Sequence, residues 1–224
     1  MGTFVNTAAI LVGSIVGSVI RKGLNEKYQN ILYDTMGLAA MGLGIHTVTT
    51  NMSDSTYPVL FIISLAIGGI LGTASDLDSK FNKLVDRYST TNLGQGLSTA
   101  VMLFCLGTLS ILGPIESALN QNHTYLFTNA TLDFVTSIVL ASTYGIGIAL
   151  SALVLFIWQG SIFLLAHQVE PLLTSAFMTE ISIVGGFLIL ASGLSILKIK
   201  SLKSLNLLPS LLIPLVWFLL IHLL

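Results

Sequence analysis

A few polar side chains stand within or at the ends of long apolar stretches of this sequence, and they are the residues with chemical potential. Asp133 and Glu180 each begin an apolar run, and Asn6 and Gln159 lie within one. A carboxylate inside a bilayer is costly and often marks an ion path. An amide in hydrocarbon needs a partner across a helix interface or in water. These side chains indicate either a polar pathway through a membrane or hydrogen bonds that join helices.

The two carboxylates have a second interpretation. Each is expected in the first turn of a helix, where a negative charge interacts favourably with the helix N-terminus. Asn129 or Thr131 would cap the helix that carries Asp133, and Thr179 the helix that carries Glu180. The alternatives are therefore a cation-attracting mouth on the outer side and ordinary carboxylates at helix starts.

Other candidates are small residues and amides near an expected helix break. Gly145, Gly147 and Ser151 interrupt a long apolar run, and Gln95 and Gln159 each precede a glycine near the start of a run. Backbone groups freed at a break must be buried in protein or face water. The residues predicted to line a solute or ion pathway are Asn6, Gln95, Ser98, Asp133, Gly145, Gly147, Ser151, Gln159, Gly160 and Glu180.

The sequence lacks the motifs of catalysis, nucleotide binding and metal binding. It contains no GxxxxGK[ST], HExxH or GxSxG pattern. His46, His123, His167 and His222 fall at or beyond the expected outer helix ends, without metal-ligand spacing. A serine nucleophile needs a neighbouring base, and none of these histidines lies at a suitable depth. We expect no enzyme activity, no metal and no cofactor.

The elements that position these residues are predicted to be transmembrane helices. The chain has 224 residues, of which 8% are charged and 54% apolar, with a mean hydropathy of +0.90. Ordinary globular chains carry about 25% charged residues. Long apolar runs of low charge indicate an all-α, polytopic membrane protein, with one membrane domain over residues 1–224 and the bilayer as partner. A net charge of −1 excludes a nucleic-acid-binding surface.

The basic residues predict the topology. All of the Lys and Arg residues fall in three clusters, at 21–27, 80–87 and 198–203. Because cytoplasmic loops carry the excess of Lys and Arg, an even number of crossings must separate these clusters, so the run 132–168 must cross twice. We predict about eight crossings with both termini outside, and a short, broken or re-entrant pair near 145–152. The predicted spans are 4–20, 35–50, 57–75, 94–114, 132–150, 152–168, 180–197 and 207–224.

Small-residue patterns recur along the chain. Gly13–Ser18 resembles Gly68–Thr73, and each precedes a charged amphipathic stretch, at 21–34 and 76–93. We expect both stretches to lie along the inner membrane interface. The recurrence predicts internal helix-pair repeats, which in transporters often enclose a pathway. Alternatively, the small residues only allow helices to pack closely, and one such face could join two copies in a homodimer.

Several segments together resemble a known family, the YqgA-like bacterial inner-membrane proteins (DUF554). The segments are Met1–Thr7, Leu103–Gly113, Leu132-Asp133, Gly145–Gly147 with Ser151, Gln159-Gly160 and Leu208-Pro209. The resemblance covers nearly the whole chain and implies a multi-pass protein of the bacterial cytoplasmic membrane. It implies no substrate or catalytic residue. The chain departs from the family pattern at Gln95-Gly96-Leu97, where an acidic residue is expected before the glycine.

We therefore predict a membrane transporter or channel for a small solute or ion, driven by gradients and not by ATP, with its N-terminus outside. The alternative is a non-transporting membrane scaffold or interaction protein. A water-accessible cavity that reaches Gln159 would favour transport, whereas a solidly packed interior would favour the scaffold.

Overall fold

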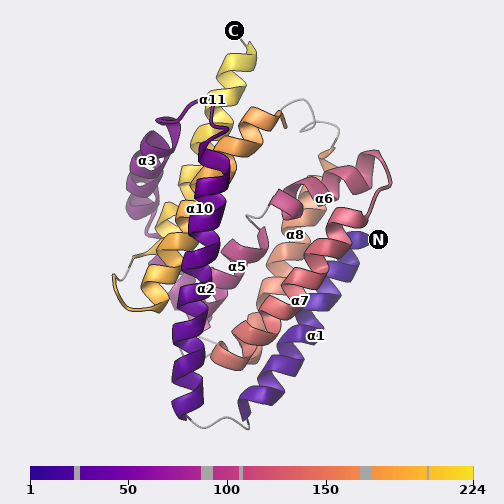
Figure 1. Ribbon diagram of the computed structural model, residues 1–224, viewed down its shortest axis with the longest axis vertical. Helices are drawn as coiled ribbons and strands as arrows, with labels where there is room; N and C mark the ends of the chain where they lie inside the picture. Colours follow the sequence, from indigo (N-terminus) through magenta and orange to yellow (C-terminus); the bar gives the residue numbers. More distant parts are fainter. Residues whose placement is uncertain (23–25, 87–92, 106–107, 167–172, 201, 224) are drawn as a thin grey trace. The chain divides into compact units, whose positions relative to one another are not determined.

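The computed structural model of the chain is built from helices (Figure 1). It describes residues 1–22, 26–86, 93–105, 108–166, 173–200 and 202–223, and within these residues there is no strand. The predicted all-α class is confirmed for this part of the chain. The helices are α1 Gly2–Lys22, α2 Glu26–Met52, α3 Leu60–Ser75, α4 Leu77–Asp86, α5 Leu93–Cys105, α6 Thr108–Leu119, α7 Thr124–Tyr144, η1 Ile146–Ala149, α8 Leu150–Leu164, α10 Ser175–Ile196, η3 Ser204–Leu211 and α11 Leu212–Leu223.

Several helices are long and apolar enough to cross a membrane. Among the described residues there are 5 such segments, or up to 6 if the bent pair α5–α6 counts as one span. The segments are Gly2–Arg21, Thr124–Tyr144, Ile146–Leu164, Ser175–Ile196 and Ser204–Ile221. Helix α3, with 16 residues, is shorter than the roughly 20 residues that a bilayer needs. The multi-pass architecture is thus present, and the count of eight stays a prediction.

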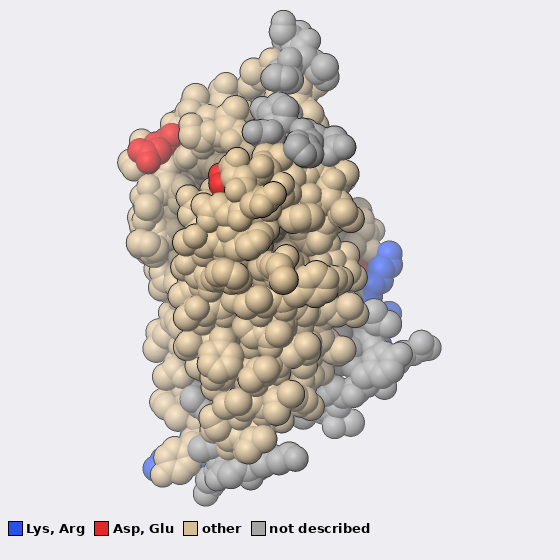
Figure 2. Space-filling view, turned by 90° about the vertical axis from the view of Figure 1, so that its right-hand side faces the viewer, with Lys and Arg blue, Asp and Glu red and all other residues tan. Residues whose placement is uncertain are grey.

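The molecular surface agrees with a lipid environment. The face shown in Figure 2 carries Lys, Arg, Asp and Glu only in small groups, and the rest of its described surface is uncharged. Large apolar side chains such as Ile70 (70% exposed) and Leu164 (78% exposed) point away from the protein. Contiguous exposed apolar surface of this kind marks contact with a membrane or a partner.

The boundaries near the expected break differ from the prediction. Helix α7 begins at Thr124, not at 132, and in its first turns the hydroxyls of Thr128 and Thr131 donate to the carbonyls of Thr124 and Phe127, so these polar side chains are satisfied within the helix. The helix ends at Gly145, whose φ of 92° is readily adopted only by glycine. The break therefore precedes Ser151, which lies inside α8.

The two charged connections also differ from each other. Helix α2 runs unbroken over 27 residues from Glu26, so residues 26–34 are the first part of a long helix, and the placement of the stretch 21–34 along the inner interface stays a prediction. The stretch 76–93 does contain a separate short helix, α4. Asp76 precedes it with a positive φ of 47°, which ends α3 and turns the chain into α4.

The helices form two compact units that interleave along the sequence. Unit 1 consists of residues 1–36 and 85–170, and unit 2 of residues 37–84 and 171–224. In unit 1, α1 runs parallel to α7 (Figure 1), since Gly2 meets Leu126, Gly13 meets Ser137 and Gly17 meets Ile138. At Gly17 the two backbones are so close that an added Cβ would collide with the Ile138 carbonyl.

Unit 2 is held by similar close contacts. Helices α2 and α10 lie side by side and run antiparallel (Figure 1), and a Cβ at Gly44 would lie 2.8 Å from the Gly186 carbonyl oxygen. The contact is reciprocal, since a Cβ at Gly186 would lie 3.1 Å from the Gly44 carbonyl oxygen. Helix α3 runs antiparallel to η3, with Gly68 against Ser210. Small residues that let backbones approach this closely are typical of membrane helix packing.

The glycine contacts lead to a stability prediction within one helix. Gly44→Ala should destabilise the protein by about 1–3 kcal/mol, because backbone atoms of α10 cannot move aside for the methyl group. Gly42→Ala is the matched control, since nothing lies within 4 Å of its Cβ position. The control should gain about 0.5–1 kcal/mol from the higher helix propensity of alanine. Thermal unfolding in detergent measures both, and equal effects would contradict this packing.

Candidate functional site

Unit 1 contains most of the predicted pathway residues. One cluster of polar side chains lies near the N-terminal end of α1. The parallel α1–α7 contact brings Asn6 beside Asp133. Asp133 is 4% exposed, and its Oδ2 accepts a 2.8 Å hydrogen bond from Nδ2 of Asn129. Within the described residues no ion pair joins Asp133 to Lys, Arg or His. A carboxyl group is thus buried in a predicted span with amides as its neighbours.

The position of Asp133 corrects one of the two earlier interpretations. Because α7 begins at Thr124, Asp133 lies in its third turn and not at its start. Asn129 is no helix cap: it lies four residues earlier on the same helix face and bonds to the carboxylate. The explanation of Asp133 as a carboxylate at a helix N-terminus is therefore wrong.

Asn6 is the least satisfied side chain of this group. It is fully buried at 0% exposed, and neither its Oδ1 nor its Nδ2 completes a hydrogen bond. The amide nevertheless lies close enough to Asp133 to stabilise the charged carboxylate. A buried amide without a partner costs about 1–3 kcal/mol, so the position favours a group that bonds to it at some stage of function.

Gln159 forms a second polar contact in the same unit. Its side chain is 0% exposed, and Nε2 donates a 3.1 Å hydrogen bond to the Ser110 hydroxyl, which joins α8 to α6. Its Oε1 has no partner. The neighbouring Gly160 borders an apolar groove of about 440 Å³ between α1 and α8, but Gln159 does not line that groove. Gln159 therefore acts as an interhelical contact in this structure.

The residues near the break form a separate set around Gly145 and Gly147. The Arg21 side chain packs over Gly145, and the Leu93 side chain packs over Gly147. Ser151 is 0% exposed and donates to the Ile148 carbonyl at 2.6 Å, so its hydroxyl is satisfied by its own chain. The break is thus filled by side chains.

The remaining predicted pathway residues, Gln95 and Ser98, lie on α5. Ser98 is 8% exposed. Gln95 lies on α5, but its side chain is outside the described residues. The ring of Tyr144, at the end of α7, packs against Gly96, which brings the start of α5 to this end of unit 1.

Glu180 belongs to unit 2, and its hydrogen bonds join two segments of that unit. It is 1% exposed, and its Oε1 accepts hydrogen bonds from Ser55 Oγ at 2.7 Å and from Tyr57 N at 2.8 Å. These bonds tie α10 to the connection between α2 and α3. Helix α10 is capped by Thr174, whose hydroxyl accepts from Phe177 N, so the explanation of Glu180 as a first-turn carboxylate capped by Thr179 is wrong.

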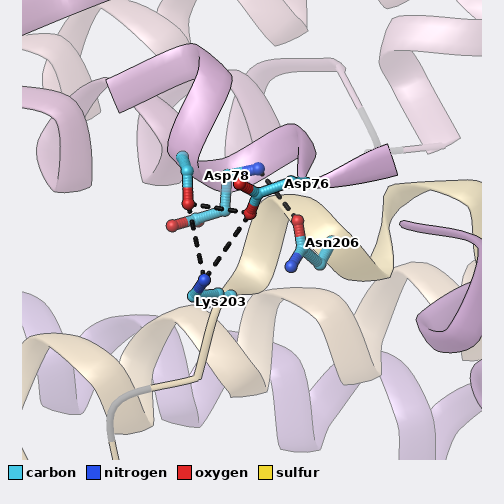
Figure 3. A network of polar contacts seen from close by, with 5 residues as sticks. Asp76, Asp78, Lys203 and Asn206 are labelled. Atoms are coloured by element: carbon cyan, nitrogen blue, oxygen red, sulfur yellow. Dashed lines mark hydrogen bonds and ion pairs between the residues drawn. The ribbon is translucent and has the colours of Figure 1, made fainter. Parts of the chain in front are cut away.

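A further polar network lies at the end of unit 2 where α3 turns into α4 (Figure 3). Oδ1 of Asp76 accepts from the Ser79 hydroxyl at 2.8 Å and lies 3.6 Å from Nζ of Lys203. Asn206 accepts from the Asp78 backbone N–H at 2.9 Å. The Ser79 hydrogen bond has the largest effect and lowers the pKa of Asp76; burial opposes it, and the charge of Lys203 adds to the lowering. The network joins the α3–α4 turn to η3.

Comparison with known proteins identifies the family. The family model described as "Protein of unknown function (DUF554)" matches residues 1–219. The chain belongs to the DUF554 family. It is 58% identical over 221 residues to "Uncharacterized membrane protein YdfK" of Bacillus subtilis (strain 168), covering 99% of this chain and 96% of that protein. It is 28% identical over 224 residues to "Uncharacterized protein YqgA" of Escherichia coli (strain K12), covering 95% and 94%. No solved structure matches the chain significantly.

The family assignment confirms the resemblance, and the name of the Bacillus relative agrees with a membrane protein. Sequence reasoning about this DUF554 chain missed several partners. Asn129 had a usable signal, its spacing of four residues from Asp133. No sequence signal indicated the contacts of Ser110, Ser55 and Arg21, because these contacts join segments far apart in the chain.

The network around Asp76 leads to a pH prediction for this DUF554 protein. Because the folded state lowers the pKa of Asp76, the network stabilises the protein above the ordinary carboxyl value and loses this effect as pH falls through the lowered pKa. Thermal midpoints measured in detergent at low salt should fall below about pH 4. Asp76→Asn should lack this part of the pH dependence, and Lys203→Gln should move its onset to higher pH. An unchanged profile in Asp76→Asn would contradict the network.

Proposed function

We propose that the protein is a transporter or channel for a small solute or ion, driven by gradients and without ATP. The observation that carries the proposal is Asp133, a carboxyl group buried within a span and without a basic partner among the described residues. Ionisable residues inside membranes are rare and usually belong to ion or substrate paths. The unsatisfied amide of Asn6 and the unpaired Oε1 of Gln159 in the same unit support it, since unpaired buried polar atoms are costly.

The bent pair α5–α6 adds support. Its two helices meet at an angle of 45° between Cys105 and Leu109. Broken membrane helices supply backbone groups to binding sites in many transporters. Cys105, at the end of α5, lies within electrostatic reach of Asp133. The end of α5 and the buried carboxyl group therefore belong to the same part of unit 1.

We propose eight crossings of the bacterial cytoplasmic membrane, with both termini outside and the basic clusters inside. Here α5–α6 is one crossing, and α2 and α3 are two more. The directions within each unit support this count: α1 is parallel to α7, α2 is antiparallel to α10, and α3 is antiparallel to η3. Eight crossings that alternate in direction along the chain require the same parallel and antiparallel pairs. We also propose that the protein has no enzyme activity, contains the predicted helix-pair repeats and forms a homodimer.

A non-transporting scaffold is the second candidate, and close packing favours it. The glycine contacts of α1, α2 and α3 leave little room between helices. Many buried hydroxyls, such as those of Ser137, Thr143 and Ser151, bond to carbonyls three or four residues earlier in the chain and need no solute. Purified protein in liposomes, tested with a panel of ions and small metabolites, separates the candidates. Flux of any of these above that of protein-free liposomes supports transport, and no flux supports the scaffold.

Gln159→Leu tests whether unit 1 carries the pathway. If Gln159 faces the solute at some stage, the change should abolish flux while the thermal midpoint holds, because leucine is similar in size and removes an unsatisfied Oε1. If Gln159 only joins α8 to α6, the variant should lose roughly 0.6–2 kcal/mol and keep its flux. Ser110→Ala is the matched control, because it removes the same hydrogen bond and leaves the amide in place. Equal flux in Gln159→Leu and the parent would contradict a pathway at this position.

Cysteine labelling tests the proposed topology in a Cys105→Ser background. Single cysteines at Ser53 and Asn122 should react with a membrane-impermeant reagent added outside, because both lie in connections that carry no Lys or Arg. Single cysteines at Asn25, Ser79 and Ser201 should react only after the membrane is opened. Outside labelling at position 201 alone would leave seven crossings and remove the double crossing of 132–168.

A further inference from the structure

The carboxyl group of Asp133 is buried among groups that can hydrogen-bond to it both when it is charged and when it is protonated. Its charged form needs hydrogen-bond donors, because an isolated charge in a low-dielectric interior is strongly destabilised. Asn129 already donates one such bond at 2.8 Å. The neighbouring Asn6 amide carries two N–H donors, and it lies beside the carboxyl group with none of them used.

The neutral form of Asp133 needs an acceptor for its own proton. The Asn6 amide supplies this as well, since its carbonyl oxygen is also without a partner. Rotation of the amide about its last side-chain bond exchanges its donor and acceptor ends. Asn6 can therefore donate to the carboxylate or accept from the carboxyl group, whereas Asn129 donates to either form.

The other charged and titratable side chains of the surrounding helices contact groups other than Asp133. On α1, Arg21 packs over Gly145, about four helical turns from Asn6. On α6, Glu116 accepts from the Asn120 side chain, and His123, just before α7, bonds to Ser117.

The N-terminal ammonium of Met1 lies five residues before Asn6, and no ion pair joins it to Asp133 among the described residues. Tyr125 and Tyr144 lie near the two ends of α7, and the Cys105 thiol of α5 is close to Asp133, but none of these three groups carries a positive charge. The contacting element η1 contains no ionisable residue. Among the described residues, therefore, no fixed cation neutralises Asp133.

A metal ion fits this site poorly. Hard cations take about six or more oxygen ligands, whereas the described side chains here offer one carboxyl group and the free Asn6 oxygen. The described residues also contain no group of three His, Cys, Asp or Glu side chains that could hold a metal. The ligand that this donor and acceptor set fits is a proton.

We infer that Asp133 binds and releases a proton during the transport cycle, with Asn6 as the positioning residue that adapts to both states. The inference rests on the proposed transport function, because a proton held here acts on a solute only if the protein moves one. Protonation transfers a proton from water to a carboxylate oxygen, and release returns it to water on either side, so no other reactant is needed.

Infrared difference spectroscopy of the full chain in liposomes tests the site without knowledge of the solute. A carboxyl C=O band should appear and disappear reversibly as the pH is changed over the range in which the protein stays folded, and Asp133→Asn should abolish it. Glu180→Gln is the matched control, because it alters a buried carboxylate of unit 2 whose Oε1 is held by Ser55 and Tyr57. The band should persist in this control.

Asn6→Leu tests the positioning role. It should move the midpoint of the band by about one pH unit toward higher pH, since hydrogen bonds to the charged form are the stronger ones. An unmoved midpoint in this variant would overturn the role of Asn6. The absence of a titrating band, its persistence in Asp133→Asn, or its displacement by Na⁺ at constant pH would overturn proton binding at Asp133.

Proton flux separates this inference from the proposed function. Liposomes that contain a pH dye and are given a membrane potential should acidify, and Asp133→Asn should reduce the rate at least about tenfold, in the range of losses for a proton-transfer group. Solute flux without proton flux would overturn the inference and leave transport standing. A titrating band without proton or solute flux would overturn both the coupling and the transport function.

Discussion

Close approach of helix backbones at glycines is the constraint on which the rest of this structure depends. Without water in the membrane interior, helices associate through packing and a few hydrogen bonds, so contact distance decides which helices pair. Gly13 and Gly17 fix α1 against α7, and Gly44 and Gly186 fix α2 against α10. The α1–α7 register that results is what brings Asn6 beside Asp133. The candidate site is therefore a consequence of helix packing and not of a dedicated loop or motif.

The buried polar groups differ in how fully they are satisfied. Glu180 receives two hydrogen bonds at one oxygen and holds a connection between helices, while its other oxygen has no partner. Ser151 bonds to the Ile148 carbonyl of η1, and Thr143 bonds to its own helix. Asn6 completes no bond, and Gln159 uses its nitrogen but not its oxygen. Stable packing alone would favour apolar residues at the last two positions, so their incomplete bonding points to a state or ligand that uses them.

Much of the fold could be predicted from the sequence, because apolar runs and glycine positions act locally. The membrane class and a break between residues 145 and 152 follow from such signals, whereas the family follows from the resemblance of several segments. The start of α7 could not be predicted from hydropathy, since the helix begins in a polar segment whose Thr128 and Thr131 hydroxyls bond to carbonyls of the helix itself. The bend between α5 and α6 could not be predicted either, because it lies in an apolar stretch.

The candidate site, too, could be predicted only in part from local sequence signals. That Asp133, Asn6 and Gln159 are unusual follows from their residue types in apolar runs. Which of them meet depends on tertiary contacts: Asn6 lies beside Asp133, whereas Gln159 bonds to Ser110. The same distinction separates Asp133 from Glu180, which look alike in sequence. Glu180 has two donors from a neighbouring connection at fixed positions on one oxygen. Asp133 has an amide neighbour that can reverse its polarity, so a change of its charge need not unfold the helix pair that buries it.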